Sequence, residues 1–181
     1  ISLESLKAVL RRAKPSDVLV LELDQERNRL KIQFKSEGTR TFNISLLDLE
    51  DKMHKIPELT FPLKIETSSL IFDEAIQDMD VVGDSVALVV QKDKFIVEAE
   101  SNLSDARSEI NVDDSTAIKT NSKEAVRAKY SIEYLKKIVK AGKLASNVIL
   151  QFNKDYPLRA DYVVKDKLSL SIVLAPRVSN D

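Results

Sequence analysis

The chain has 181 residues and a formal net charge of -1, with no cysteine, one histidine and three glycines. This length suffices for one large core or two smaller ones, and the near-neutral charge excludes a globally basic nucleic-acid binder, so any DNA contact must come from a local patch. The missing cysteine excludes disulfides, thiolate catalysis and the usual zinc sites, and it favours an intracellular protein. Neither a membrane span nor a signal peptide is expected, because the sequence has no long apolar run and no charged-then-apolar leader.

Apolar periodicity predicts helices and short strands along the chain. The first element is expected to be an amphipathic helix from Ser2 to Lys14, capped by Ser2 and ended by Pro15. Its apolar stripe is expected to consist of Leu3, Leu6, Leu10 and Ala13. Further helices are expected at 68–80 and 131–142, and strands at 18–23, 30–34, 39–47, 61–67, 85–90, 95–99, 106–112, 117–122, 127–131, 148–152, 158–164 and 168–174.

The same succession of helix, turn and strand occurs three times. The helices start near Ser2, Ser68 and Ser131, and a turn followed by an apolar strand comes after each. A spacing of about sixty-five residues indicates one supersecondary unit used repeatedly, although the first copy lacks the lead strand of the other two. Because the links between strands are too short for parallel crossovers, we expect an α+β fold with helices on one face of antiparallel sheets.

The stretch from Leu46 to Phe61 separates the first copy from the other two. It mixes charged and apolar residues and follows neither the helical nor the strand period, which indicates a connector. The expected organisation is therefore an incomplete first body over 1–47, a connector over 48–61 and a complete second body over 62–181.

The sequence lacks the motifs of common catalytic sites. It contains no P-loop, dinucleotide-binding glycine pattern, Gly-x-Ser-x-Gly or His-Glu-x-x-His. The acidic pairs Asp78 with Asp80 and Asp113 with Asp114 are better interpreted as solvated side chains than as cation ligands, and His54 as a surface histidine. We therefore predict no catalytic residue, no cofactor and no metal, with a hydrolase as the remote alternative.

Basic side chains recur with the spacing i, i+4 and i+7 on two of the predicted helices. They are Lys7, Arg11 and Lys14 on the first helix, and Lys136, Lys140 and Lys143 on the third. One such stripe is usually just a solvated face, but two at equivalent positions of a repeat could pool into a surface that contacts phosphates without reading bases. The middle helix is acidic from Asp73 to Asp80, and we leave it out of this surface.

Two predicted strands have the character of exposed sheet edges. The strand at 39–47 alternates and leaves the sheet through the connector, and the strand at 106–112 carries Arg107 and Glu109 on its outward face. Such edges are either protected surface or an oligomer seam, and the residues favour neither alternative.

Several segments resemble the DNA sliding clamp of archaea and eukaryotes, the proliferating cell nuclear antigen family. The resemblance rests on the helix, turn and strand at 3–23, Leu-Leu-Asp-Leu-Glu at 46–50, Ile-Pro-Glu at 56–58, Val-Gly-Asp at 82–84, Tyr-Leu at 134–135, Pro-Leu at 157–158 and Leu-Ala-Pro-Arg-Val at 174–178. It runs over the whole chain in order, and the composition looks archaeal. It implies the DNA clamp fold, with 1–47 as the second half of the N-terminal domain, 48–61 as the interdomain connecting loop and 62–181 as the C-terminal domain.

The resemblance also implies a function. Three subunits, identical or paralogous, would form a ring that encircles duplex DNA without sequence preference and raises polymerase processivity. DNA polymerase, the clamp loader, flap endonuclease and DNA ligase would bind through short glutamine-and-aromatic peptide motifs. The implied location is cytoplasmic in an archaeon or nuclear in a eukaryote.

The resemblance assigns three groups of residues. The DNA-facing group is Lys7, Arg11, Lys14, Lys136, Lys140 and Lys143. The pocket for the partner peptide is Met53, His54, Ile56, Pro57, Phe61, Pro157, Val173, Ala175 and Pro176. The subunit interface is Phe42, Ile44, Arg107, Glu109 and Ile110. Two alternatives remain open, namely one subunit of a heterotrimeric clamp, and a peptide-binding scaffold that does not encircle DNA.

Overall fold

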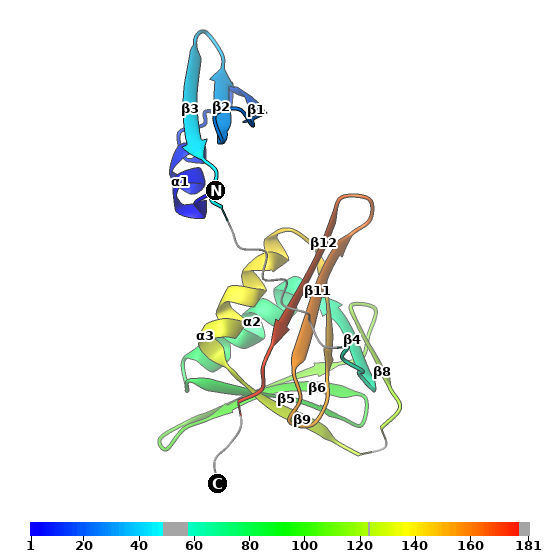
Figure 1. The fold of residues 1–181 in the computed structure, drawn as a ribbon. Coiled ribbons are helices and arrows are strands. Elements are labelled where there is room, and N and C mark those ends of the chain that lie inside the picture. Colours follow the sequence, from blue (N-terminus) through cyan, green and yellow to red (C-terminus); the bar gives the residue numbers. More distant parts are fainter. Residues whose placement is uncertain (49–57, 123, 178–181) are drawn as a thin grey trace. The chain divides into compact units, whose positions relative to one another are not determined.

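The computed structural model describes residues 1–48, 58–122 and 124–177 (Figure 1). The chain divides into two compact units, Ile1–Pro57 and Glu58–Asp181. Within the described ranges, no helix has both the length and the apolar character that a membrane crossing requires.

Unit 1 is a helix followed by a three-stranded antiparallel sheet. The helix α1 is Leu3–Leu10, and the strands are β1 (Val18–Asp24), β2 (Arg29–Lys35) and β3 (Thr39–Ser45), paired in the order β1-β2-β3. A small core forms from Ile32, Phe34 and Ile44, which are almost fully buried. The Phe34 and Phe42 rings meet edge to face with 5.7 Å between centroids, a favoured arrangement for aromatic pairs.

The first helix differs from its prediction in length and in buried face. Ser2 does cap it, because the Ser2 hydroxyl accepts a hydrogen bond from the Ser5 N–H at 3.2 Å. The helix ends at Leu10, however, four residues before the predicted Lys14. Ile1, Leu6 and Val9 pack against the core. Of the predicted stripe, Leu3, Leu10 and Ala13 are exposed, so only Leu6 was placed correctly.

Unit 2 contains two antiparallel sheets and a pair of helices. The five-stranded sheet has the order β12-β11-β10-β4-β8, and the four-stranded sheet has the order β7-β6-β5-β9. The strands are β4 (Leu63–Ser68), β5 (Ser85–Gln91), β6 (Lys94–Glu100), β7 (Asp105–Asn111), β8 (Thr116–Thr120), β9 (Val126–Ser131), β10 (Asn147–Phe152), β11 (Leu158–Val164) and β12 (Leu168–Leu174). The helices are α2 (Ser69–Asp80) and α3 (Ile132–Ile138), and α3 continues into the 3₁₀ helix η1 (Val139–Lys143).

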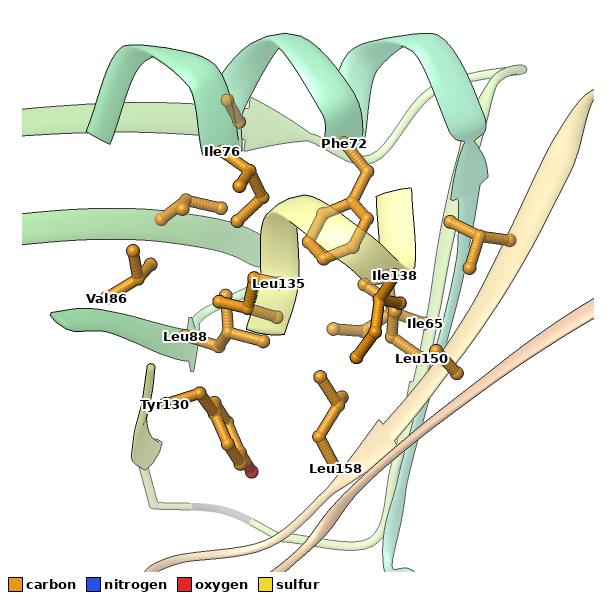
Figure 2. Close-up of a cluster of buried hydrophobic side chains, with 14 of the residues drawn as sticks. Ile65, Phe72, Ile76, Val86, Leu88, Tyr130, Leu135, Ile138, Leu150 and Leu158 are labelled. Carbon is orange, nitrogen blue, oxygen red and sulfur yellow. The ribbon is translucent and has the colours of Figure 1, made fainter. Parts of the chain in front are cut away.

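The core of unit 2 lies between the helix pair and the inner faces of both sheets (Figure 2). Phe72 and Ile76 reach it from α2 and Leu135 from α3, and each of them is fully buried. Tyr130 projects into it from β9, and its hydroxyl donates to the Tyr156 carbonyl at 2.7 Å. Burial of the phenol raises the pKa of Tyr130, so it stays a neutral donor. Leu158 adds to the same core from β11.

The two helices of unit 2 pack closely at one point. A Cβ placed on Gly142 in η1 would come within 2.9 Å of the Ser69 Cβ at the start of α2. Beside this contact, the Ser69 hydroxyl donates to the Ala145 carbonyl at 2.8 Å, and the Ser69 N–H donates to the Ser146 carbonyl at 2.8 Å. Gly142 therefore sets how near the end of the third helix lies to the start of the second.

The α+β architecture of helices and antiparallel sheets expected from the sequence is confirmed in both units. The succession β4, α2, β5, β6, β7 recurs as β9, α3, β10, β11, β12, which is the predicted repeat, and β8 is an addition between the copies. The strand predictions agree with the structure to within two residues at each end. The third helix, predicted as one element over 131–142, is α-helical only to Ile138 and then tightens into η1.

Candidate functional site

The basic residues of the third helix lie on two kinds of helix. Lys136 belongs to α3, whereas Lys140 and Lys143 belong to η1, where residues three apart eclipse one another. Lys136 is half-buried, and its ammonium is paired with the Asp80 carboxylate at the end of α2. Lys140 and Lys143 are exposed and share one side of η1. The three cations are therefore not equivalent, and the exposed pair is the better candidate for phosphate contact.

The acidic residues of α2 partly neutralise their basic neighbours. Asp80 holds Lys136, while Asp73 accepts a hydrogen bond from the Gln77 amide at 3.1 Å. Glu74 and Asp78 are exposed. Because α2 packs beside α3 and η1 (Figure 1), the electrostatic potential of this helix pair is mixed and weaker than the lysine spacing alone indicates.

The basic residues of the first helix do not form one helical stripe. Lys7 lies within α1, Arg11 is the C-cap residue just after its end at Leu10, and Lys14 lies farther along the chain. The Lys14 N–H donates to the Asp17 carboxylate at 2.7 Å, which fixes the turn into β1. Asp17 is also paired with Arg40, and the Lys14 N–H and the Arg40 guanidinium hold the pKa of the Asp17 carboxyl below its ordinary value. All three cations are exposed, so their exposure agrees with the expectation while their helical register does not.

The acidic pairs considered as cation ligands have other roles. Asp113 accepts hydrogen bonds from the Ser115 N–H and hydroxyl and from the Thr116 N–H, and these bonds lower the pKa of its carboxyl and close the turn before β8. In the described ranges, no three acidic or histidine side chains converge as a metal site would require. Asp80 instead pairs with Lys136.

The described residues of the predicted peptide pocket fall into two groups, Phe61 with Pro157, and Val173 with the tail that follows β12. Phe61 packs edge to face on Tyr156 with 5.7 Å between ring centroids, next to the half-buried Pro157. Val173, in β12, pairs with Arg159 of β11 and is exposed. Ala175 and Pro176 follow in the tail. The other predicted pocket residues, Met53, His54, Ile56 and Pro57, lie outside the described residues.

Two cavities flank the chain where it leaves β12. One, of about 570 Å³, is lined by Asp84, Ser131, Ile132, Glu133, Tyr134, Leu174, Ala175, Pro176 and Arg177. The other, of about 230 Å³ and mostly apolar, is lined by Tyr134, Lys137, Ile138, Ile172, Val173 and Leu174. Tyr134 and Leu174 border both cavities. The sequence prediction included Val173, Ala175 and Pro176 but none of the helix residues opposite them.

Arg177 fixes the position of this tail. Its N–H donates to the Lys129 carbonyl of β9 at 2.7 Å, and its guanidinium donates to the Asp84 carbonyl at 3.2 Å and to the Asp84 carboxylate at 2.8 Å. The guanidinium holds the pKa of the Asp84 carboxyl below its ordinary value. Both residues belong to motifs that carry the family resemblance, Val-Gly-Asp84 and Ala-Pro-Arg177. No sequence pattern indicates that Arg177 and Asp84 form an ion pair.

The predicted interface strands are sheet edges in both units. β3 ends the order β1-β2-β3, and β7 ends the order β7-β6-β5-β9. On β7, Arg107 pairs with Glu109 at 2.9 Å, and Lys94 pairs with the same carboxylate at 2.6 Å. The hydrogen bonds from Lys94 and then Arg107 lower the pKa of the Glu109 carboxyl. These ion pairs leave the strand edge itself unpaired.

The apolar residues predicted for the interface pack within their own units, and their role at an interface stays a prediction. Ile110 is only 8% exposed and packs in the core of unit 2, because its side chain points to the inner face of β7. Ile44 is likewise buried in the core of unit 1, and Phe42 is half-buried beside it. All three stabilise their own unit, so a substitution there would disturb folding before it tested an interface.

The chain is similar to archaeal sliding clamps over almost all of its length. A family model described as the C-terminal domain of proliferating cell nuclear antigen matches residues 55–177. The DNA polymerase sliding clamp of Thermococcus gammatolerans is 33% identical over 178 residues, which are 98% of this chain and 71% of that protein. The DNA polymerase sliding clamp of Methanococcus maripaludis strain C6 is 33% identical over 184 residues, covering 99% of this chain and 73% of that protein.

A solved structure gives the same result for the fold. The crystal structure of PCNA from Thermococcus kodakaraensis matches with a TM-score of 0.85 and 26% identity, covering 98% of this chain and 72% of that chain. The sequence resemblance, the family model and the structural match therefore agree. The chain belongs to the proliferating cell nuclear antigen family of DNA polymerase sliding clamps.

Proposed function

We propose that this protein acts as a processivity factor, forming a ring around duplex DNA and tethering replication and repair enzymes to it. The observation that carries the proposal is the match to a PCNA structure with a TM-score of 0.85 over 98% of the chain. No step of this function requires catalysis, because enclosure keeps the protein on DNA. The ring assumed here has three subunits of this chain or of paralogues.

Retention on DNA of different topology tests enclosure. The protein should stay bound to closed circular DNA after loading and should be lost when the circle is linearised. Equal loss from both forms would instead favour the alternative of a peptide-binding scaffold that never encircles DNA.

Lys140 and Lys143 should supply the main phosphate contacts of the third helix. Replacing both with Ala should reduce the salt dependence of DNA binding, with the slope falling by about 0.9 for each lost contact. Lys136→Ala should have a smaller effect, since Asp80 already neutralises that ammonium. The control is Lys165→Ala with Lys167→Ala, which removes the same charge from an exposed turn; an equal effect of the control would reject the assignment.

The partner pocket should include the tail beside β12. Pro176 is half-buried and lines the larger cavity, so Pro176→Ala should weaken binding of a synthetic glutamine-and-aromatic peptide. Ile56 is a predicted pocket residue of the connector, so Ile56→Ala tests whether the connector also contributes to peptide binding. Polymerase, clamp loader, flap endonuclease and DNA ligase would all compete for this pocket. A peptide affinity that neither substitution changes would refute the pocket assignment.

Subunits should join through the free edges of β3 and β7. Light scattering over a concentration series should give three times the protomer mass of 20.4 kDa for a homotrimer. A monomer that assembles only when a paralogue is added would favour the heterotrimer. Arg107→Glu is a suitable interface variant, because Arg107 is exposed on the outer face of the edge strand, whereas Ile110 points to its inner face and is part of the core. A ring that persists in this variant would exclude a β7 interface.

A further inference from the structure

We propose that the Arg177–Asp84 pair is a positioning element, which holds the tail at 175–177 in place as a wall of the partner-peptide pocket. This inference rests on the proposed function of that pocket. Neither residue needs to contact the peptide: the pair acts on binding through Ala175 and Pro176, whose position it fixes.

The tail has few other attachments. Beyond Leu174, the last residue of β12, the hydrogen bonds of the described tail all come from Arg177. Pro176 has no N–H to donate. If Arg177 were released, the chain after β12 would lose its fixed direction at the point where it lines the cavity of about 570 Å³.

The attachment point is itself rigid. The Asp84 carbonyl accepts the N–H of Ile132, the first residue of α3, at 3.1 Å as well as the Arg177 guanidinium. Asp84 also directly precedes β5, and Lys129, the second acceptor for Arg177, lies in β9. The tail is thereby tied to the start of a helix and to two strands of the four-stranded sheet, and all of these belong to the same core.

The pair also suits a reversible attachment. The Arg177 guanidinium is about half exposed and the Asp84 carboxylate is mostly exposed, so water and salt compete for both groups. Arg177 adds a backbone hydrogen bond to the ion pair, which restricts the chain more than the side-chain contact alone. The tail should therefore be held most of the time, and released more often when one partner is removed.

The expected consequence is a change in apparent affinity. A ligand that needs the held tail binds with its intrinsic dissociation constant divided by the held fraction. If loss of the pair lowers that fraction to about one fifth, the upper end for an exposed ion pair, the apparent dissociation constant rises about fivefold. The cavity residues on α3, including Tyr134, would be unchanged.

The test measures affinity and dissociation rate for a synthetic peptide bearing the glutamine-and-aromatic motif. Arg177→Gln should weaken binding up to about fivefold and Asp84→Asn by no more than that, because the bond from the guanidinium to the Asp84 carbonyl survives only in Asp84→Asn. The double variant should be no worse than Arg177→Gln alone, since the ion pair is already lost there. The exchanged pair Arg177→Asp with Asp84→Arg should recover part of the affinity. Thermal midpoints should change little, since both groups lie at the surface.

Hydrogen exchange supplies a second readout that needs no peptide. The Arg177 amide should exchange faster in Asp84→Asn, while amides within β12 keep their protection. Unchanged peptide affinity in both single variants, or single effects that simply add in the double variant, would overturn the positioning role. If the unmodified protein does not bind the peptide, the proposed pocket is refuted, even when Asp84→Asn still raises the hydrogen-exchange rate of the Arg177 amide.

Discussion

Gly142 offers a sharp test of how the two helices of unit 2 are held together. A Cβ at this position would lie 2.9 Å from the Ser69 Cβ, closer than real Cβ atoms approach. Ser69 cannot yield easily, because its N–H and its hydroxyl are both hydrogen-bonded to the chain just after η1. Gly142→Ala should therefore push η1 away from the start of α2.

The expected magnitude is the difference between two effects. Overpacking of a dense interior typically destabilises by about 1–3 kcal/mol, whereas replacing Gly by Ala where the backbone permits it stabilises by about 0.4–1 kcal/mol through the unfolded chain. Gly142→Ala should thus lower the free energy of unfolding by about 1–2 kcal/mol. At about 4 °C per kcal/mol, the thermal midpoint should fall by about 4–8 °C.

Gly83→Ala is the matched control within the same unit. A Cβ at Gly83 would meet only the Glu100 carbonyl oxygen at 3.6 Å, an ordinary contact, and its backbone does not have a positive φ. This variant should be as stable as the unmodified protein or slightly more stable. Denaturant unfolding followed by circular dichroism measures both variants. Equal stability of Gly142→Ala and Gly83→Ala would refute the tight contact with Ser69.

Two further predictions concern polar groups that are well enclosed. The hydroxyls of Thr67 and Thr116 are buried and lie 2.8 Å apart, so Thr116→Val should lower the free energy of unfolding by about 1–3 kcal/mol, and adding Thr67→Val should recover part of the loss in denaturant titrations. The Lys14 N–H, and also the Arg40 guanidinium, hold the pKa of Asp17 below its ordinary value of 3.8, so this carboxylate stabilises unit 1 above that pH and the effect is lost as the pH falls through the folded-state pKa. Asp17→Asn should flatten the acid dependence of the thermal midpoint, and an unaltered acid dependence would contradict this role.

The strands were predictable from their apolar pattern and from the turns between them. In β4 and β9 buried side chains alternate with more exposed ones, whereas β5 is a continuous apolar run that is buried on both faces. Short polar turns separate neighbouring strands and locate their ends. The end of α1 was not predictable in the same way. Leu10 and Ala13 continue the helical apolar spacing, but the helix ends where the chain must turn into β1 and where Asp17 accepts the Lys14 N–H.

The candidate site was predictable where one element carries the residues and not where two distant segments meet. Lysine spacing identified the third helix, but only the structure brings Asp80 to Lys136 across 56 positions of sequence. Arg177 and Asp84 are 93 positions apart, and nothing in either segment indicates the other. The role of Ile110 at an interface stays a prediction for a related reason, since a buried position of an edge strand looks the same in sequence whether its own core or a partner covers it.

The charges of unit 2 bear on how a sliding clamp would hold DNA. A protein that binds DNA mainly by electrostatics neutralises many phosphates, and its affinity then falls steeply with salt. This chain has a formal net charge of -1, and its helix pair sets Asp80 against Lys136 and leaves Lys140 and Lys143 exposed. In the proposed ring, such a surface would supply few phosphate contacts from unit 2, too few for stable binding and too few to arrest movement along the duplex. In the proposed ring, retention must then come from closure of the subunits, so variants at the β3 and β7 edges should shorten the residence time on DNA more than lysine substitutions do.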